Sequence, residues 1–196
     1  HIGIWVIGKQ GRIFQYDANK DDFRMVYKLP DISETISCGY LDRNNNIWLC
    51  CKDSILLYNI NDAHILQFSN ILHSNITAIE QIDEQHFFIA TELGVRYVKL
   101  ENGILETVPV KTLDYFHAQV SELYFHKQLK RLFIGSFERG VFVYDMNTQE
   151  IMRPEADLSD VNIARISPLN ETELLIATEG MGVYKVNANT CELEHY

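Results

Sequence analysis

Polar and aromatic residues follow an apolar strand at several places in the sequence, and these residues could bind a ligand. The clearest pair is Phe137 and Arg139, directly after the run 132–136. An aromatic ring can cover the C–H face of a sugar, and a guanidinium can donate two parallel hydrogen bonds to oxygen atoms. Equivalent turns carry Lys52, Glu92 and Glu179. The pattern indicates a binding site built on loops.

Residue patterns typical of catalysis, cofactor binding or metal binding are not found in the sequence. The 7 histidines are scattered and form no H-E-x-x-H or H-x-H motif, and there is no G-x-S-x-G motif or P-loop. Asp42, Asn44 and Asn46 resemble the start of a calcium-binding loop, but Ile47 stands where that loop needs Gly. We therefore interpret 42–46 as a β-turn and expect no cofactor.

One sequence motif, two predicted strands joined by a tight turn, occurs five times along the chain. Its second position holds a large residue, and successive copies are 43, 40, 45 and 42 residues apart, at Trp5, Trp48, Phe88, Phe133 and Leu175. Short strands that repeat every 40–45 residues are typical of β-propeller blades. Helical repeats of this length need amphipathic runs of ten or more residues, and the sequence has none.

The repeat predicts an all-β protein with about five four-stranded antiparallel blades, the first of which lacks its inner strand. The units are 1–34, 35–75, 76–119, 120–162 and 163–196 of one propeller segment. Pro30, Pro109 and Pro154 all fall in or beside the links between units, where a residue without an N–H suits a chain that leaves a sheet edge. We interpret the whole as an arc or fragment of a larger propeller of about seven blades.

The second strand of each unit is a continuous apolar run, as in Leu132, Phe133 and Ile134. Both faces of such a strand must be covered, which neighbouring blades would do. Small residues at 90, 135 and 177 indicate where blades approach closely. Exposed edges of an open arc would need the remaining blades or a second copy, so a homodimer is one possibility.

Two kinds of loop meet on one face of a propeller, namely the turns between second and third strands and the links between units. We expect ligands to meet this face. His117 and Gln119 lie in a link and add to Phe137 and Arg139, and Asn162 lies in the next link. The alternative for each residue is a solvated loop side chain.

Composition excludes several partners. There are 17 basic and 27 acidic residues, a net charge of −10, and no clustered Lys and Arg, which argues against nucleic acid and against an anionic membrane surface. No apolar run approaches the roughly 20 residues that span a bilayer. The chain opens almost directly on a strand, so we expect its natural start to lie upstream.

The 4 cysteines form no C-x-x-C motif, which disfavours zinc and thioredoxin-like sites. Cys38 and Cys50 flank the turn at 42–46 and could face each other across a hairpin. Buried thiols that fill the cores are the favoured interpretation, with a disulfide as the alternative.

The segment 42–49, and 132–136 followed by Gly140 to Asp145, resemble the two-component regulator propeller repeat. That repeat runs Asp, a polar turn, Leu-Trp-Ile-Gly-Thr, a Gly-rich turn, and a strand that ends in Tyr-Asp. The chain departs from it at Asn45, at Phe88, Phe133 and Leu175 in the Trp position, and at Gly8 and Cys51 in the Thr position.

Such repeats form the periplasmic sensor region of hybrid two-component histidine kinases in gut bacteria. The resemblance implies a non-enzymatic, ligand-sensing segment of an inner-membrane receptor that recognises an oligosaccharide and relays to a downstream kinase. Two alternatives stay open. One is a scaffold propeller that binds only protein, and the other is a propeller enzyme acting on polysaccharide, which needs converging carboxylates. The inner-strand positions look small or apolar, which argues against the enzyme.

Overall fold

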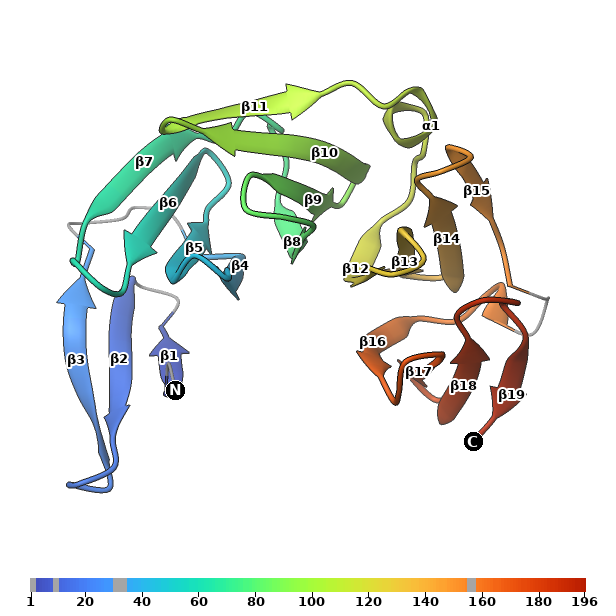
Figure 1. Cartoon of the computed structure of the whole chain (residues 1–196). Helices are drawn as coiled ribbons and strands as arrows, with labels where there is room; N and C mark the ends of the chain where they lie inside the picture. The colour runs from blue at the N-terminus through green and yellow to red at the C-terminus, as the bar shows by residue number, and fades with distance from the viewer. Residues whose placement is uncertain (1–2, 9–10, 30–34, 155–157) are drawn as a thin grey trace. The chain divides into compact units, whose positions relative to one another are not determined.

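The computed structural model describes residues 3–8, 11–29, 35–154 and 158–196, drawn as ribbons in Figure 1. The chain divides into two compact units, residues 1–76 and 77–196. Each sheet is antiparallel, and its strands lie in the order in which they follow along the chain.

The first unit holds two sheets. The first has three strands, β1 (Trp5–Ile7), β2 (Arg12–Asp17) and β3 (Asp22–Lys28). The second has four, β4 (Cys38–Leu41), β5 (Asn46–Cys50), β6 (Ser54–Asn59) and β7 (Ile65–Ser69).

The other three sheets have four strands each. The third contains β8 (Ile76–Gln81), β9 (His86–Thr91), β10 (Gly94–Glu101) and β11 (Ile104–Val108). After the helical turn α1 (Lys111–Asp114), the fourth contains β12 (Val120–His126), β13 (Arg131–Ser136), β14 (Val141–Asp145) and β15 (Glu150–Met152). The fifth contains β16 (Ile163–Pro168), β17 (Glu173–Thr178), β18 (Val183–Asn187) and β19 (Leu193–His195).

The predicted all-β fold is confirmed, including the first sheet with three strands where the others have four. The sequence pattern missed α1, because a helix of four residues has no periodicity to detect. Pro109 directly follows β11 and Pro154 lies two residues after the end of β15, so both fall beside links as expected. The expectation for Pro30 lies outside the described residues.

The turn at 42–46 is confirmed as a β-hairpin turn. The carboxylate of Asp42, only 2 % exposed, accepts hydrogen bonds from the backbone N–H groups of Asn44 and Asn46 at 2.9 and 2.8 Å. It also accepts one at 2.9 Å from the indole N–H of Trp48. Asn45 adopts a positive φ of 64°, which Asn tolerates better than most residues. The aspartate thus links the turn to the core tryptophan.

The cysteines are free thiols. Cys38 and Cys50 lie directly opposite each other in the β4–β5 hairpin, as expected. A hydrogen bond with Cys38, together with burial, raises the pKa of the Cys50 thiol. Cys50, Cys51 and Cys191 are buried, which confirms the core-filling interpretation for these three.

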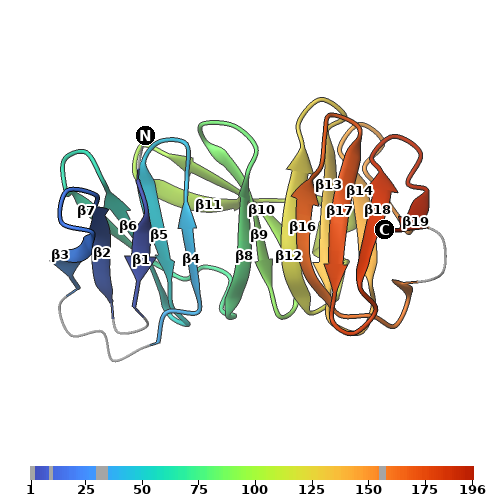
Figure 2. The same cartoon turned by 90° about the horizontal axis from the view of Figure 1, so that it is seen from below.

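The apolar faces of neighbouring sheets form the cores. In the first unit, Ile13 and Leu29 pack with Ile47 and Leu49. In the second unit, one core joins the third and fourth sheets around Phe88, and another joins the fourth and fifth sheets around Phe133. Figure 2 shows the strands of these last two sheets running alongside one another.

Close backbone approach holds the fourth and fifth sheets together. A Cβ atom on Gly135 would lie 2.6 Å from a side-chain methyl carbon of Ile163, so only Gly fits without a shift. The Ser121 hydroxyl donates a hydrogen bond of 2.6 Å to the Ile163 carbonyl. In the first unit, the Ser37 hydroxyl likewise donates a hydrogen bond of 3.0 Å to the Ile76 carbonyl.

A partly buried ion pair joins strands β13 and β14 to the turn after β18. Arg131 Nε lies 3.0 Å from Asp145 Oδ2, and its Nη1 donates to the carbonyls of Ala188 and Asn189. Burial acts to raise the pKa of Asp145, but hydrogen bonds from Arg131 and from the backbone N–H groups of Asn147 and Thr148 outweigh it. The pKa of Asp145 therefore lies below its ordinary value.

We expect Gly135→Ala to lower the free energy of unfolding by about 1–3 kcal/mol, because the added methyl group overpacks the contact with Ile163. Gly8→Ala is the control, since a Cβ there would meet only ordinary contacts of 3.5 Å or more. Urea unfolding followed by circular dichroism measures both variants. Equal effects of the two substitutions would contradict the close approach.

We expect Asp145→Asn to destabilise the protein by about 1–3 kcal/mol at neutral pH. A carboxylate whose pKa is lowered by folding contributes stability above its unfolded pKa of about 3.9, and this contribution is lost as pH falls through the folded value. The gap between the wild type and the variant should therefore shrink below about pH 4. Urea unfolding over a pH series tests this, and a gap independent of pH would refute it.

Candidate functional site

The loop 137–140 connects β13 to β14 and is held in one conformation. Ser136 donates hydrogen bonds from its N–H and hydroxyl to the Gly140 carbonyl, at 3.0 and 2.7 Å. Gly140 has a φ of 66°, and a Cβ there would overlap the Leu158 carbonyl oxygen. Glycine is therefore required, and it lets the link after β15 pass directly against the loop.

Hydrogen bonds bring four of the predicted site residues together. The Phe137 N–H donates to the Gln119 carbonyl at 2.9 Å, and Arg139 Nη1 donates to the His117 carbonyl at 2.6 Å. His117, Gln119 and Arg139 are exposed, whereas Phe137 is half-buried. We call these four residues the loop cluster.

Asn162 joins this cluster to the fifth sheet. Its Oδ1 accepts a hydrogen bond from the Glu138 N–H at 2.8 Å, and its Nδ2 donates to Glu179 Oε2 at 2.9 Å. Glu179, a predicted site residue, is thus placed beside the cluster. The other two candidates are not among the residues that these bonds join. Lys52 lies in the β5–β6 turn of the first unit, and Glu92 lies exposed in the β9–β10 turn.

Two arginines lie over the ring of Phe142, namely Arg139 of the loop and Arg153 after β15. The guanidinium carbon of Arg153 lies 4.4 Å from the ring centre and that of Arg139 lies 5.4 Å from it, both within cation–π range. Phe116 supports the same ring edge-on, with centres 5.0 Å apart. Sequence reasoning missed Arg153, because its position at the end of an outer strand carries no turn signal.

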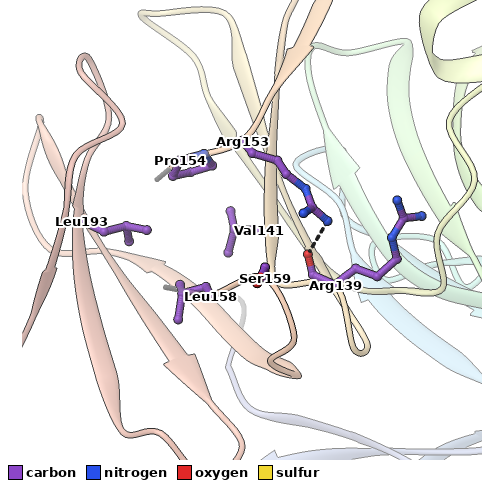
Figure 3. A pocket seen from close by; sticks show the side chains of 7 residues that line it. All are labelled: Arg139, Val141, Arg153, Pro154, Leu158, Ser159 and Leu193. Carbon is purple, nitrogen blue, oxygen red and sulfur yellow. Dashed lines mark hydrogen bonds between the residues drawn. The ribbon is translucent and has the colours of Figure 1, made fainter. Parts of the chain in front are cut away.

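A small pocket of about 140 Å³ opens beside these arginines. Figure 3 shows Arg153 reaching to the Arg139 carbonyl, to which its Nη2 donates at 3.1 Å, while the Arg139 side chain points away from Leu193. The pocket is lined by Arg139, Val141, Arg153, Pro154, Leu158, Ser159 and Leu193. Ligand sites usually enclose 300–1,000 Å³, so this pocket suits one substituent of a larger ligand.

The electrostatics of this region favour a polar ligand. None of the ion pairs among the described residues includes Arg139 or Arg153. Each guanidinium has five N–H donors, and one bond to a carbonyl is resolved for each. Donors therefore remain for oxygen atoms of a ligand.

The structure differs from the expectation that the inner-strand positions are small or apolar. They are not uniformly small or apolar, because Glu122 on β12 lies 3.4 Å from Arg165 on β16. Burial raises the pKa of Glu122, and the charge of Arg165 acts against that shift. The sequence could not distinguish inward from outward positions here, since a bulge shifts the register between Val120 and Glu122.

The described residues contain neither a cluster of metal ligands nor a membrane-spanning helix. No group of three or more His, Cys, Asp or Glu side chains in residues 3–8, 11–29, 35–154 and 158–196 could hold a metal ion. In the same residues, no helix is both long enough and apolar enough to cross a membrane.

The repeated four-stranded sheets define a β-propeller fold, and known structures agree. The extracellular domains of a candidate one-component system and of a candidate hybrid two-component system, both from B. thetaiotaomicron, match 97 % of the chain at 18 % identity. Their TM-scores are 0.74 and 0.72. The β-propeller domain of Cps50 (Swd1) from Myceliophteria thermophila matches 93 % at 15 % identity, with a TM-score of 0.68.

The chain spans 25 %, 28 % and 60 % of the lengths of these three structures. No protein-family model matches the sequence, and no curated protein matches it either. The likeness therefore establishes the fold, at an identity too low to transfer a ligand or an activity.

We expect Asn162→Ala to loosen the loop 137–140, because the Glu138 N–H loses its acceptor. Loss of one such bond corresponds to about 1 kcal/mol, so exchange of the Glu138 amide should accelerate about five- to tenfold. Hydrogen exchange measured by NMR tests this. The Gly140 amide is the control, because it donates to the Val161 carbonyl, which the substitution leaves in place. Equal acceleration at both amides would contradict the assigned role.

Proposed function

We propose that this chain is an extracytoplasmic, ligand-sensing propeller segment of a two-component signalling receptor. The likeness to extracellular domains of signalling systems supports this, together with the resemblance of the repeats to two-component regulator propellers. In this proposal the segment belongs to a periplasmic region of an inner-membrane receptor, is not itself an enzyme, and relays to a kinase further along the chain.

The ligand in this proposal is an oligosaccharide, and the loop cluster is its site. The observation that carries this assignment is the fixed placement of Phe137 beside Arg139, with His117 and Gln119 hydrogen-bonded to their loop. A half-buried ring offers an apolar surface to a sugar, and the guanidinium and amide groups around it suit hydroxyl oxygens. Glu179 extends the surface through Asn162.

Signalling requires that the ligand favour one state of the receptor. The loop cluster draws on two sheets, because Asn162 follows the fourth sheet and Glu179 follows β17 of the fifth. A ligand that binds across these loops, and binds this arrangement more tightly than another, would stabilise it. Remaining blades, or a second copy in a homodimer, would carry the change onward.

Calorimetric titration with a panel of neutral and acidic oligosaccharides tests the site. We expect Phe137→Ala and Arg139→Ala each to weaken binding about tenfold or more, as for central contacts in binding sites. Lys127→Ala is the control, because Lys127 is exposed in the turn at the opposite end of β13. Undiminished binding by both site variants would reject the loop cluster. No binding across the panel would favour a protein-binding scaffold, and turnover of a glycan would favour an enzyme.

A further inference from the structure

One cross-strand row in the first sheet differs from its equivalents. Trp5 on β1 lies opposite Gln15 on β2, which lies opposite Arg24 on β3. Residues paired in this way project from the same face of a sheet. This face is turned toward the second sheet, since Trp5, Ile7 and Ile13 pack with Ile47 and Leu49.

The equivalent rows of the next three sheets are apolar. They read Trp48–Leu57–Leu66, Phe88–Tyr97–Val108 and Phe133–Val143–Met152. The fifth row, Leu175–Lys185–Glu194, is polar, but its charges pair at 3.2 Å, and no described sheet of the second unit covers it. Among the described sheets, only the first row places polar groups without an ion-pair partner on a face that packs against a neighbour.

Gln15 and Arg24, which stand where the next three sheets have apolar residues, border a groove in the first unit. The groove measures about 400 Å³, within the usual range for small-ligand sites. Trp5, Gln15, Arg24 and Met25 line one side, and Tyr58 of the second sheet lines the other. In the third sheet Tyr97 occupies the position of Gln15 and packs on Phe88, with ring centres 5.4 Å apart. The shorter Gln15 leaves that space open beside the indole.

The polar edge of the groove is rich in donors. Arg24 Nη2 donates to Gln15 Oε1 at 3.2 Å, and the Nε2 group of Gln15, which lines the groove, is a further hydrogen-bond donor. None of the ion pairs among the described residues includes Arg24. A guanidinium and an amide side by side suit a ligand that presents several acceptors, above all a carboxylate. The partly exposed indole of Trp5 suits the C–H face of a sugar ring.

We propose that this groove binds a sugar ring that carries a carboxylate, that is, a uronic acid unit. Trp5 covers the apolar face of the ring, and Arg24 and Gln15 hold the carboxylate. The site is separate from the loop cluster in residues and in chemistry. It therefore stands or fails independently of the proposed oligosaccharide site there.

Tryptophan fluorescence of the 196-residue chain tests the proposal directly. Of its 2 tryptophans, Trp48 is 0 % exposed, so ligand-dependent changes and acrylamide quenching report on Trp5. Disaccharides of galacturonic, glucuronic and mannuronic acid are the probes, and galactobiose is the neutral counterpart. We expect saturable protection of Trp5 by at least one uronate disaccharide, with galactobiose binding at least tenfold more weakly.

The double variant Gln15→Leu with Arg24→Leu copies the row of the second sheet, and should fold while binding at least tenfold more weakly. Thermal unfolding checks that the fold is kept, and Arg24→Gln is the milder variant if it is not. Lys127→Ala should leave this binding unchanged, because Lys127 is exposed and lines neither site. The proposal is overturned if no uronate disaccharide protects Trp5, if galactobiose binds as well as the uronates, or if Arg24→Gln binds as tightly as the wild type.

Discussion

The rest of the structure depends on one constraint, namely that both faces of each central strand are apolar and must be covered. Phe88, Phe133 and Ile134 have no exposed surface, although adjacent positions such as 133 and 134 project to opposite faces. A single sheet could not bury both sets. Each sheet is therefore stable only beside its neighbours, as in other repeat proteins. The same close packing of neighbouring sheets requires glycine at position 135, where the backbone approaches Ile163.

This packing also places the loops. Because β13 is clamped between neighbouring sheets, the loop that follows it leaves at a fixed point against the link after β15. Gly140 meets the Leu158 carbonyl there, and Asn162 bonds to turns on either side. The hydrogen bonds of this loop and its links therefore hold the loop cluster in a defined place beside the core. Pre-organised side chains lose less entropy on binding, which favours affinity.

The strands were predictable because each one carries a strong local pattern, an apolar run bounded by turn residues such as those at 42–46. The register was harder, because bulges such as the one after Val120 turn Glu122 to a side that alternation does not indicate. Hydrogen bonds to backbone carbonyls, as from Arg139 to His117, depend on tertiary contacts. Arg153 and α1 could not be predicted, because the sequence does not distinguish either of them from an ordinary link between strands.

Repeats make departures from the common pattern informative. In the second, third and fourth sheets the same row across the strands is apolar, and in the fifth it contains a charged pair. Gln15 and Arg24 fit neither pattern, because they face a neighbouring sheet without an acidic partner among the described residues. A polar group that loses water without gaining a partner costs about 1–3 kcal/mol, whereas leucine in the same row would contribute burial. Arg24 is exposed and Gln15 is half-buried, so the groove beside Trp5 keeps both groups accessible to water or to a ligand.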